Sequence, residues 1–128
     1  MKKLMIAVAM MLASPAFAAD PMIGTWKTQV DDGAYAHVDI APCGGVKVCG
    51  VIAHTFNDQG EYKSPNIGKM LVIDMVPNGD NSYEGSVWRP SNNKIYIGKI
   101  ELAGDTLYMR GCIAGGLLCS KQTWKRLK

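Results

Sequence analysis

The segment Leu107–Trp124, LYMRGCIAGGLLCSKQTW, decides the fold because it contains a complete β-hairpin. At its centre, Gly115-Gly116 can adopt the positive φ angles that a tight turn between two strands requires. Counting outward from this turn gives the cross-strand pairs Ile113–Leu118, Cys112–Cys119, Arg110–Lys121, Met109–Gln122, Tyr108–Thr123 and Leu107–Trp124. One face of the hairpin is then mostly apolar and the other polar, as in an antiparallel sheet with one face on a core.

This register places two cysteines opposite each other. Directly opposed residues lie within disulfide reach, so Cys112 and Cys119 should form a bridge on the outer face. Cys43 and Cys49 flank a Gly-Gly pair and need a wider or bulged loop to meet, with Cys49 also pointing outward. Four cysteines allow three connectivities. The local pairing agrees with the hairpin register, and we predict two local disulfides, Cys43–Cys49 and Cys112–Cys119.

The alternative for the cysteines is one zinc ion held by all four thiolates. The pairs have five and six intervening residues, which is wider than the spacing of typical zinc knuckles. We therefore predict no metal site.

The first 18 residues have the pattern of a Sec-type signal peptide. Lys2 and Lys3 precede the apolar run 4–12, and Ala16-Phe17-Ala18 supplies small residues before a cleavage site. We predict removal of residues 1–18 and a single domain over residues 19–128, periplasmic or secreted, where disulfides form. The apolar run is shorter than the roughly 20 residues of a membrane span, and no later stretch is longer without charges or turn residues, so we predict no membrane insertion.

The charge of the chain is nearly balanced. It has 14 basic and 11 acidic residues, and two of the basic residues lie in the predicted signal peptide. Nucleic-acid-binding proteins usually have a strong basic excess or a basic patch. We therefore predict no nucleic-acid partner.

Past residue 20, short β-rich runs alternate with Gly, Pro, Asn and Asp. The expected strands cover residues 22–29, 34–42, 46–55, 69–76, 82–89, 94–102, 105–113 and 117–127. Eight such strands with short turns predict an all-β fold, an eight-stranded antiparallel up-and-down β-barrel. The one long connection, residues 56–68, should be a loop at one mouth of the barrel.

Strand parity predicts which side chains point into this barrel. The expected interior residues are Trp26, Val38, Ile40, Val48, Ile52, Leu71, Ile73, Tyr96, Ile100, Leu102, Leu107, Met109, Leu118, Gln122 and Trp124.

The two ends of the domain resemble those of a known barrel class. Gly24-Thr25-Trp26 opens the first strand and Trp124-Lys125-Arg126 closes the last. This pattern is similar to calycin or lipocalin-like barrels, in which an N-terminal Gly-x-Trp packs beneath an arginine of the final strand. The resemblance implies a contact between Trp26 and Arg126 at one barrel end.

Further motifs resemble one bacterial family. They are Cys43-Gly44-Gly45 with Val48-Cys49-Gly50, Tyr83-Glu84-Gly85 to Pro90, Lys94-Ile95-Tyr96, and Arg110-Gly111-Cys112 through Cys119-Ser120-Lys121-Gln122-Thr123-Trp124. Together they look like domain-of-unknown-function family 2147, small exported proteins similar to calycin barrels. The chain departs from the family's Tyr-Asp-Pro-x-x-Gly-Lys stretch, where it has Trp88-Arg89-Pro90. The family has no established activity, so the resemblance implies fold and address.

A barrel of this size is either filled by its own side chains or holds one small ligand. We predict binding of a small, largely apolar molecule, with Tyr96 and Gln122 as polar contacts. The other candidate ligand-binding residues are Trp26, Met109 and Trp124. The alternative is a non-enzymatic envelope or interaction protein with a filled core, in which Trp88, Arg89 or the loop from Phe56 meets an unidentified protein partner.

Catalytic residues are not evident. His37 beside Asp39, His54, and the pair Asp58 and Glu61 are the candidates, and for each we expect a solvated strand or loop residue. A hydrolytic site needs a nucleophile, a base and an orienting group, and the sequence has no Gly-x-Ser-x-Gly or His-Glu-x-x-His motif. We predict that the protein is not an enzyme and uses no cofactor.

Overall fold

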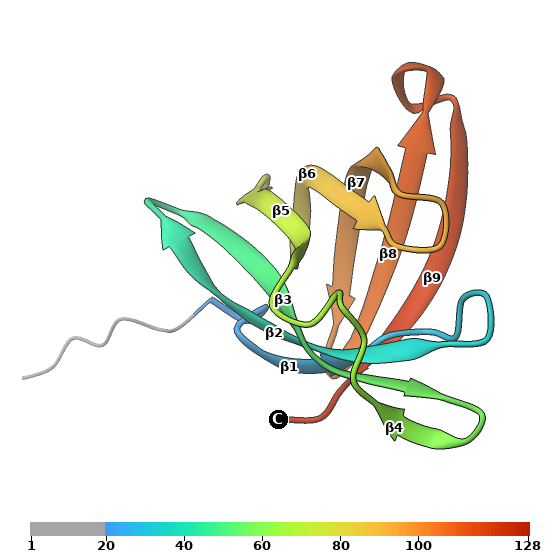
Figure 1. Ribbon diagram of the computed structural model, residues 1–128. Coiled ribbons are helices and arrows are strands. Elements are labelled where there is room, and N and C mark those ends of the chain that lie inside the picture. Colours follow the sequence, from blue (N-terminus) through green and yellow to red (C-terminus); the bar gives the residue numbers. More distant parts are fainter. Residues whose placement is uncertain (1–19) are drawn as a thin grey trace, which may run out of the picture.

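A computed structural model describes residues 20–128, and the predicted signal peptide lies outside the described residues (Figure 1). The strands are β1 (Gly24–Lys27), β2 (Tyr35–Gly44), β3 (Lys47–Asn57), β4 (Gly60–Tyr62), β5 (Met70–Pro77), β6 (Ser82–Arg89), β7 (Lys94–Ala103), β8 (Thr106–Ile113) and β9 (Leu118–Arg126), with a 3-10 turn η2 (Ala114–Gly116) before the last. All eight expected strands are present. The long connection was predicted as a loop, but it contains β4, which pairs with the end of β3 as a short hairpin. Within the described part of the chain, no helix is long and apolar enough to cross a membrane.

The strands form a closed barrel. Neighbouring strands of the barrel pair antiparallel in the order β1, β2, β3, β5, β6, β7, β8 and β9. The last strand, β9, pairs with β1 and closes the barrel. This confirms the eight-stranded up-and-down barrel, with β4 as an additional strand on β3. The closure is short, because β1 and β9 pair only at Trp26–Arg126 and Lys27–Lys125.

The hairpin register predicted from Gly115-Gly116 is confirmed, including Met109 opposite Gln122 and Leu107 opposite Trp124. Gly115 and Gly116 have φ angles of 69° and 96°. The turn is a 3-10 turn rather than a two-residue loop. It lies near Lys99 on the outer face: a Cβ added at Gly116 would be 3.6 Å from Lys99 Nζ.

Both disulfides are formed as predicted. The first requires the expected bulge, because Pro42 pairs with Val48 and Gly44 with Lys47, which leaves Cys43 as the additional residue. In the described residues no cysteine is free, so the four-thiolate zinc alternative has no thiolate ligand.

Strand parity predicted most of the core correctly and failed at two positions. Ile73 is only half-buried, whereas Val72 and Met75 are fully buried, because the register of β5 against β3 shifts between Met70 and Val72 and again between Val72 and Met75. At the second shift Asp74 has a φ of 50°. Leu118 is 62% exposed, since the β8–β9 hairpin projects beyond the other strands (Figure 1). The residues of the hydrophobic core cluster that parity did not include are Met22, Ala36, Val72, Met75, Tyr83 and Val87.

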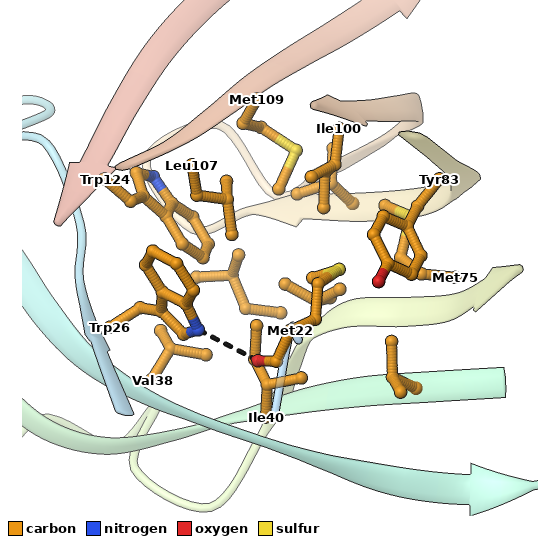
Figure 2. Packing of buried hydrophobic residues seen from close by; sticks show 14 of the residues in the cluster. Met22, Trp26, Val38, Ile40, Met75, Tyr83, Ile100, Leu107, Met109 and Trp124 are labelled. Atoms are coloured by element: carbon orange, nitrogen blue, oxygen red, sulfur yellow. Dashed lines mark hydrogen bonds between the residues drawn. The ribbon is translucent and has the colours of Figure 1, made fainter. Parts of the chain in front are cut away.

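One end of the barrel is closed by the segment before β1. Met22 is completely buried, and its carbonyl accepts a hydrogen bond from Trp26 Nε1 at 3.0 Å (Figure 2). The Arg126 guanidinium lies over the Trp26 ring, 4.3 Å from its centroid, in the arrangement that the calycin resemblance implies. Arg126 also donates to the carbonyls of Ile23 and Pro21. The N-terminal segment is therefore tied to the last strand.

Candidate ligand-binding cavity

The other half of the barrel contains a cavity of about 300 Å³. Its apolar wall is formed by Ala36, Ile52, Leu71, Val87, Met109 and Trp124. Its rim is formed by the loop after β1, the segment after β4, the loop after β6 and the first residues of β9. The cavity is thus apolar inside and polar at the mouth, opposite the end that Met22 closes.

Glycines divide the packed half from the hollow half. At Gly50, a Cβ would lie 2.8 Å from Val38 Cγ1 and 3.0 Å from Val72 Cβ, so the close packing leaves no space for a side chain. At Gly111, which lines the cavity, a Cβ would meet Tyr96 at 3.5 Å, an ordinary van der Waals contact. Space for an added side chain therefore exists on the cavity side.

Gly111 belongs to a row of small residues across four strands. The register pairs Gly85 with Gly98, Gly98 with Gly111, and Gly111 with Ser120. The Met75 side chain occupies the space over Gly98, where a Cβ would lie 2.5 Å from its Cε. Met75 thus fills one part of the row, and the part at Gly111 stays open.

Tyr96 supplies a hydroxyl group to the cavity. Asn92 Nδ2 donates to this hydroxyl at 2.6 Å. This hydrogen bond, together with the nearby positive charge of Arg89, lowers the pKa of Tyr96 below its ordinary value. A phenol with a lowered pKa is a stronger hydrogen-bond donor, so Tyr96 suits a ligand oxygen that accepts.

Gln122 supplies an amide group from β9, which is separated from the Tyr96 strand β7 by β8 alone. Its Oε1 accepts from Trp124 Nε1 at 2.8 Å, which fixes the orientation of the amide. This is the one hydrogen bond that the Gln122 side chain makes with the described residues. A half-buried amide nitrogen beside a cavity then has donors available for a ligand or for water.

An ion pair spans the mouth. Asp31 follows β1 and Arg89 ends β6, and around the barrel these strands are separated by β7, β8 and β9 on one side and by β2, β3 and β5 on the other. Arg89 donates from Nε to Asp31 Oδ2 at 2.8 Å and from Nη2 to Oδ1 at 2.7 Å. We call this pair the mouth bridge. The hydrogen bonds from Arg89 hold the pKa of Asp31 below its ordinary range, so the bridge is charged at neutral pH.

Four of the five predicted ligand-binding residues line the cavity. They are Tyr96, Met109, Gln122 and Trp124. Trp26 does not: it is completely buried beneath Arg126 at the closed end. Parity alone selected it, and parity does not say at which end of a barrel an inward residue lies. The sequence reasoning also missed Asp31 and Gly111 as parts of the site. A glycine at an inward position of a strand was the available signal for Gly111.

The residues expected at a surface partner site are engaged within the chain. Trp88 Nε1 donates to Asn93 Oδ1 at 2.9 Å, and Lys69 Nζ lies 5.6 Å from the centre of the Trp88 ring. Arg89 is held in the mouth bridge.

These features define a class of protein, a calycin-like up-and-down barrel with one plugged end and a cavity toward the other. The chain belongs to a bacterial family: residues 24–126 match the model of the family described as "Uncharacterized protein conserved in bacteria (DUF2147)". This confirms the resemblance found in the motifs. No curated protein and no solved structure was found to match the chain. Two disulfides in so small a domain are typical of proteins outside the reducing cytoplasm.

Proposed function

We propose that this barrel is a container for one small, largely apolar molecule whose polar group lies at the mouth. The observation that carries this proposal is the cavity of about 300 Å³, with an apolar wall and a polar rim. Ligand sites are mostly apolar concavities of roughly 300 to 1,000 Å³ with a few placed polar groups. The cavity is at the lower limit of this range, which favours a small ligand.

The contrast between the two halves of the barrel supports a container over a filled core. Protein interiors are close-packed, and a void removes contact partners from the atoms that line it. Here the half around Gly50 has no space for one more carbon atom, whereas the half around Gly111 has. A barrel that served only as its own core would gain stability by filling this space.

The polar groups suggest what the ligand presents. Tyr96 and Gln122 both offer hydrogen-bond donors, whereas Asp31 balances the charge of Arg89 at the rim. A carbonyl or hydroxyl oxygen on an otherwise apolar molecule would satisfy these donors. We therefore expect a ligand with an accepting oxygen at one end.

A binding role is preferred to a catalytic one. The hydroxyl groups of nucleophilic type in the described cavity lining belong to Thr28, Thr55, Ser64, Ser91 and Ser120, and neither His37 nor His54 is among the described residues that line it. Ser91 Oγ donates to Asp31 Oδ2 at 3.3 Å, but Arg89 holds this carboxylate and lowers its pKa, so Asp31 is a poor general base. Together with the predicted signal peptide, the disulfides support a periplasmic or secreted binding protein.

The alternative of a surface partner site remains a prediction. Two of its expected contact residues, Trp88 and Arg89, make contacts within the chain, and Phe56, where the expected loop begins, stacks on Tyr35. We therefore prefer the container.

The test is to plug the cavity. Gly111→Phe puts a ring into the open space, and the backbone φ of Gly111 is one that any residue can adopt. Wild-type protein should bind one equivalent of the apolar fluorescent probe anilinonaphthalene sulfonate, and Gly111→Phe should not, although it keeps the circular dichroism spectrum of the wild type. Gly111→Ala is the matched control, because it leaves most of the volume and should still bind. Equal binding by the Phe variant, or no probe binding and no co-purifying small molecule for the wild type in native mass spectrometry, would overturn the proposal.

A further inference from the structure

The two histidines of the described chain meet on the outside of the barrel. His37 on β2 and His54 on β3 are direct cross-strand partners. Their ring centroids are 5.9 Å apart, with the ring planes at 67°. His37 is half-buried and the His54 side chain is 56% exposed. They belong to the same surface depression, which Thr25 and Asp39 also line and which is separate from the ligand cavity.

Glu61 fixes the state of the His54 ring. Its Oε2 lies 2.8 Å from His54 Nδ1. A carboxylate can only accept, so Nδ1 carries the hydrogen, and Nε2 of the neutral ring keeps its lone pair. Histidines that bind metals typically donate their other N–H to a carboxylate in this way. The short β3–β4 hairpin brings Glu61 back beside His54, and this contact leaves Nε2 of His54 as the nitrogen that can bind a metal ion.

His37 is held in place by aromatic neighbours. Its ring lies against Phe56, with centroids 4.5 Å apart, and Phe56 in turn stacks on Tyr35 at 4.8 Å. These contacts fix the position of the His37 ring beside His54.

We propose that His37 and His54 bind one divalent transition-metal ion on the outer face of the barrel, with Glu61 as the carboxylate that orients His54. Two imidazoles suit Cu²⁺, Ni²⁺ and Zn²⁺, and Cu²⁺ binds most tightly in this series. Asp39 follows His37 on the same face, and one of its oxygens accepts from Thr25 Oγ1 at 2.7 Å. Within the described part of the chain, His37, His54 and Asp39 do not bring three ligand atoms within 4.8 Å of one another, so water supplies the remaining ligands.

Nearby positive charges oppose the ion. Lys27 is the cross-strand partner of His37, but its Nζ lies 4.9 Å from the centroid of the Tyr35 ring. Lys27 therefore opposes the ion, as does Lys128 in the same depression, whereas the carboxylates of Glu61 and Asp39 favour it. Lys27→Met should strengthen binding of the metal.

The test uses the full mature chain without a purification tag, titrated with Cu²⁺ by calorimetry. The wild type should bind one equivalent, and its electron paramagnetic resonance spectrum should show hyperfine coupling to two imidazole nitrogens. The double variant His37→Ala/His54→Ala should lose both signals. Glu61→Gln should weaken binding by about tenfold, the lower end of the loss for orienting carboxylates. Asp58→Asn, in the same hairpin, is the matched control and should bind as the wild type does.

A second measurement tests the geometry without copper. Long-range ¹H–¹⁵N NMR should show His54 as the Nδ1–H tautomer, and Zn²⁺ should shift the Nε2 resonance of His54 together with a ring nitrogen of His37. Copper binding by the double variant as tight as that of the wild type would overturn the proposal, as would a wild type that binds no copper. A Glu61→Gln variant no weaker than Asp58→Asn would remove Glu61 from the site.

Discussion

Replacing Gly50 and Gly111 separately by alanine should change stability in opposite directions. Both glycines have backbone conformations that alanine adopts without strain, so each replacement gains about 0.4 to 1 kcal/mol by restricting the unfolded chain. The difference between them is what the added methyl group meets. This pair of variants therefore measures the free space in each half of the barrel.

At Gly50 the methyl group would lie 2.8 Å from Val38 Cγ1 and 3.0 Å from Val72 Cβ. Both neighbours are β-branched and fully buried, so neither can turn away. Overpacking of this kind costs about 1 to 3 kcal/mol, and after the gain from the unfolded state Gly50→Ala should destabilise by about 1 to 2 kcal/mol.

At Gly111 the nearest atoms to the methyl group would be Tyr96 Cβ at 3.5 Å and Cγ at 3.6 Å. These are favourable contacts, so Gly111→Ala should stabilise by about 0.5 kcal/mol. The two variants then differ by roughly 2 kcal/mol, which is about 8 °C in Tm for a domain of this size.

The assay is thermal and urea unfolding followed by tryptophan fluorescence with both disulfides intact. A Gly111→Ala variant that loses as much stability as Gly50→Ala would show that the space beside Tyr96 is filled in solution. That result would refute the division of the barrel into a packed and a hollow half, and with it the main support for a ligand.

Two further predictions concern charged groups. Arg126→Ala should destabilise by about 1 to 2 kcal/mol, because Arg126 covers the Trp26 ring and donates to the carbonyls of Ile23 and Pro21. Lys125→Ala should cost much less, and equal losses of stability in urea would contradict the contact between Arg126 and Trp26. The lowered pKa of Asp31 means that its stabilisation is complete above the ordinary carboxyl pKa of about 3.9 and is lost as the pH falls through the lowered value. Tm should therefore fall less between about pH 5 and pH 2 in Asp31→Asn than in the wild type. If Tm falls equally with pH in both proteins, the mouth bridge is not the cause of the acid destabilisation.

The hairpin register was predictable because it depends on local chemistry. Once Gly115-Gly116 marks the turn, the period of two along each strand fixes every pair, and the two cysteines lie opposite each other as a check. The β5 strand was less predictable, because its register against β3 shifts on both sides of Val72 and no residue type announces these shifts. A bulge is set by how a strand fits both neighbours, which is information from outside the strand.

The candidate site was also predictable only in part. Strand parity identified Tyr96 and Gln122 as inward residues of the sequence, but the position of an inward residue along the barrel axis depends on how far each strand is shifted relative to the next. Trp26 shows this, since it is inward and yet does not line the cavity. The mouth bridge between Asp31 and Arg89 joins loops on opposite sides of the barrel, and only closure of the sheet brings such loops together.

The glycine row shows why a cavity that depends on particular residues is difficult to predict from the sequence. Gly85, Gly98 and Gly111 become neighbours only because the hairpins of β6 to β8 align them. A row without side chains leaves space on the inner face, and the structure fills that space at Gly98 with the flexible end of Met75. Nothing equivalent reaches Gly111. The position of one methionine on a bulged strand thus determines where packing ends and the cavity begins, so a smaller residue at Met75 should extend the cavity toward the closed end rather than open a separate one.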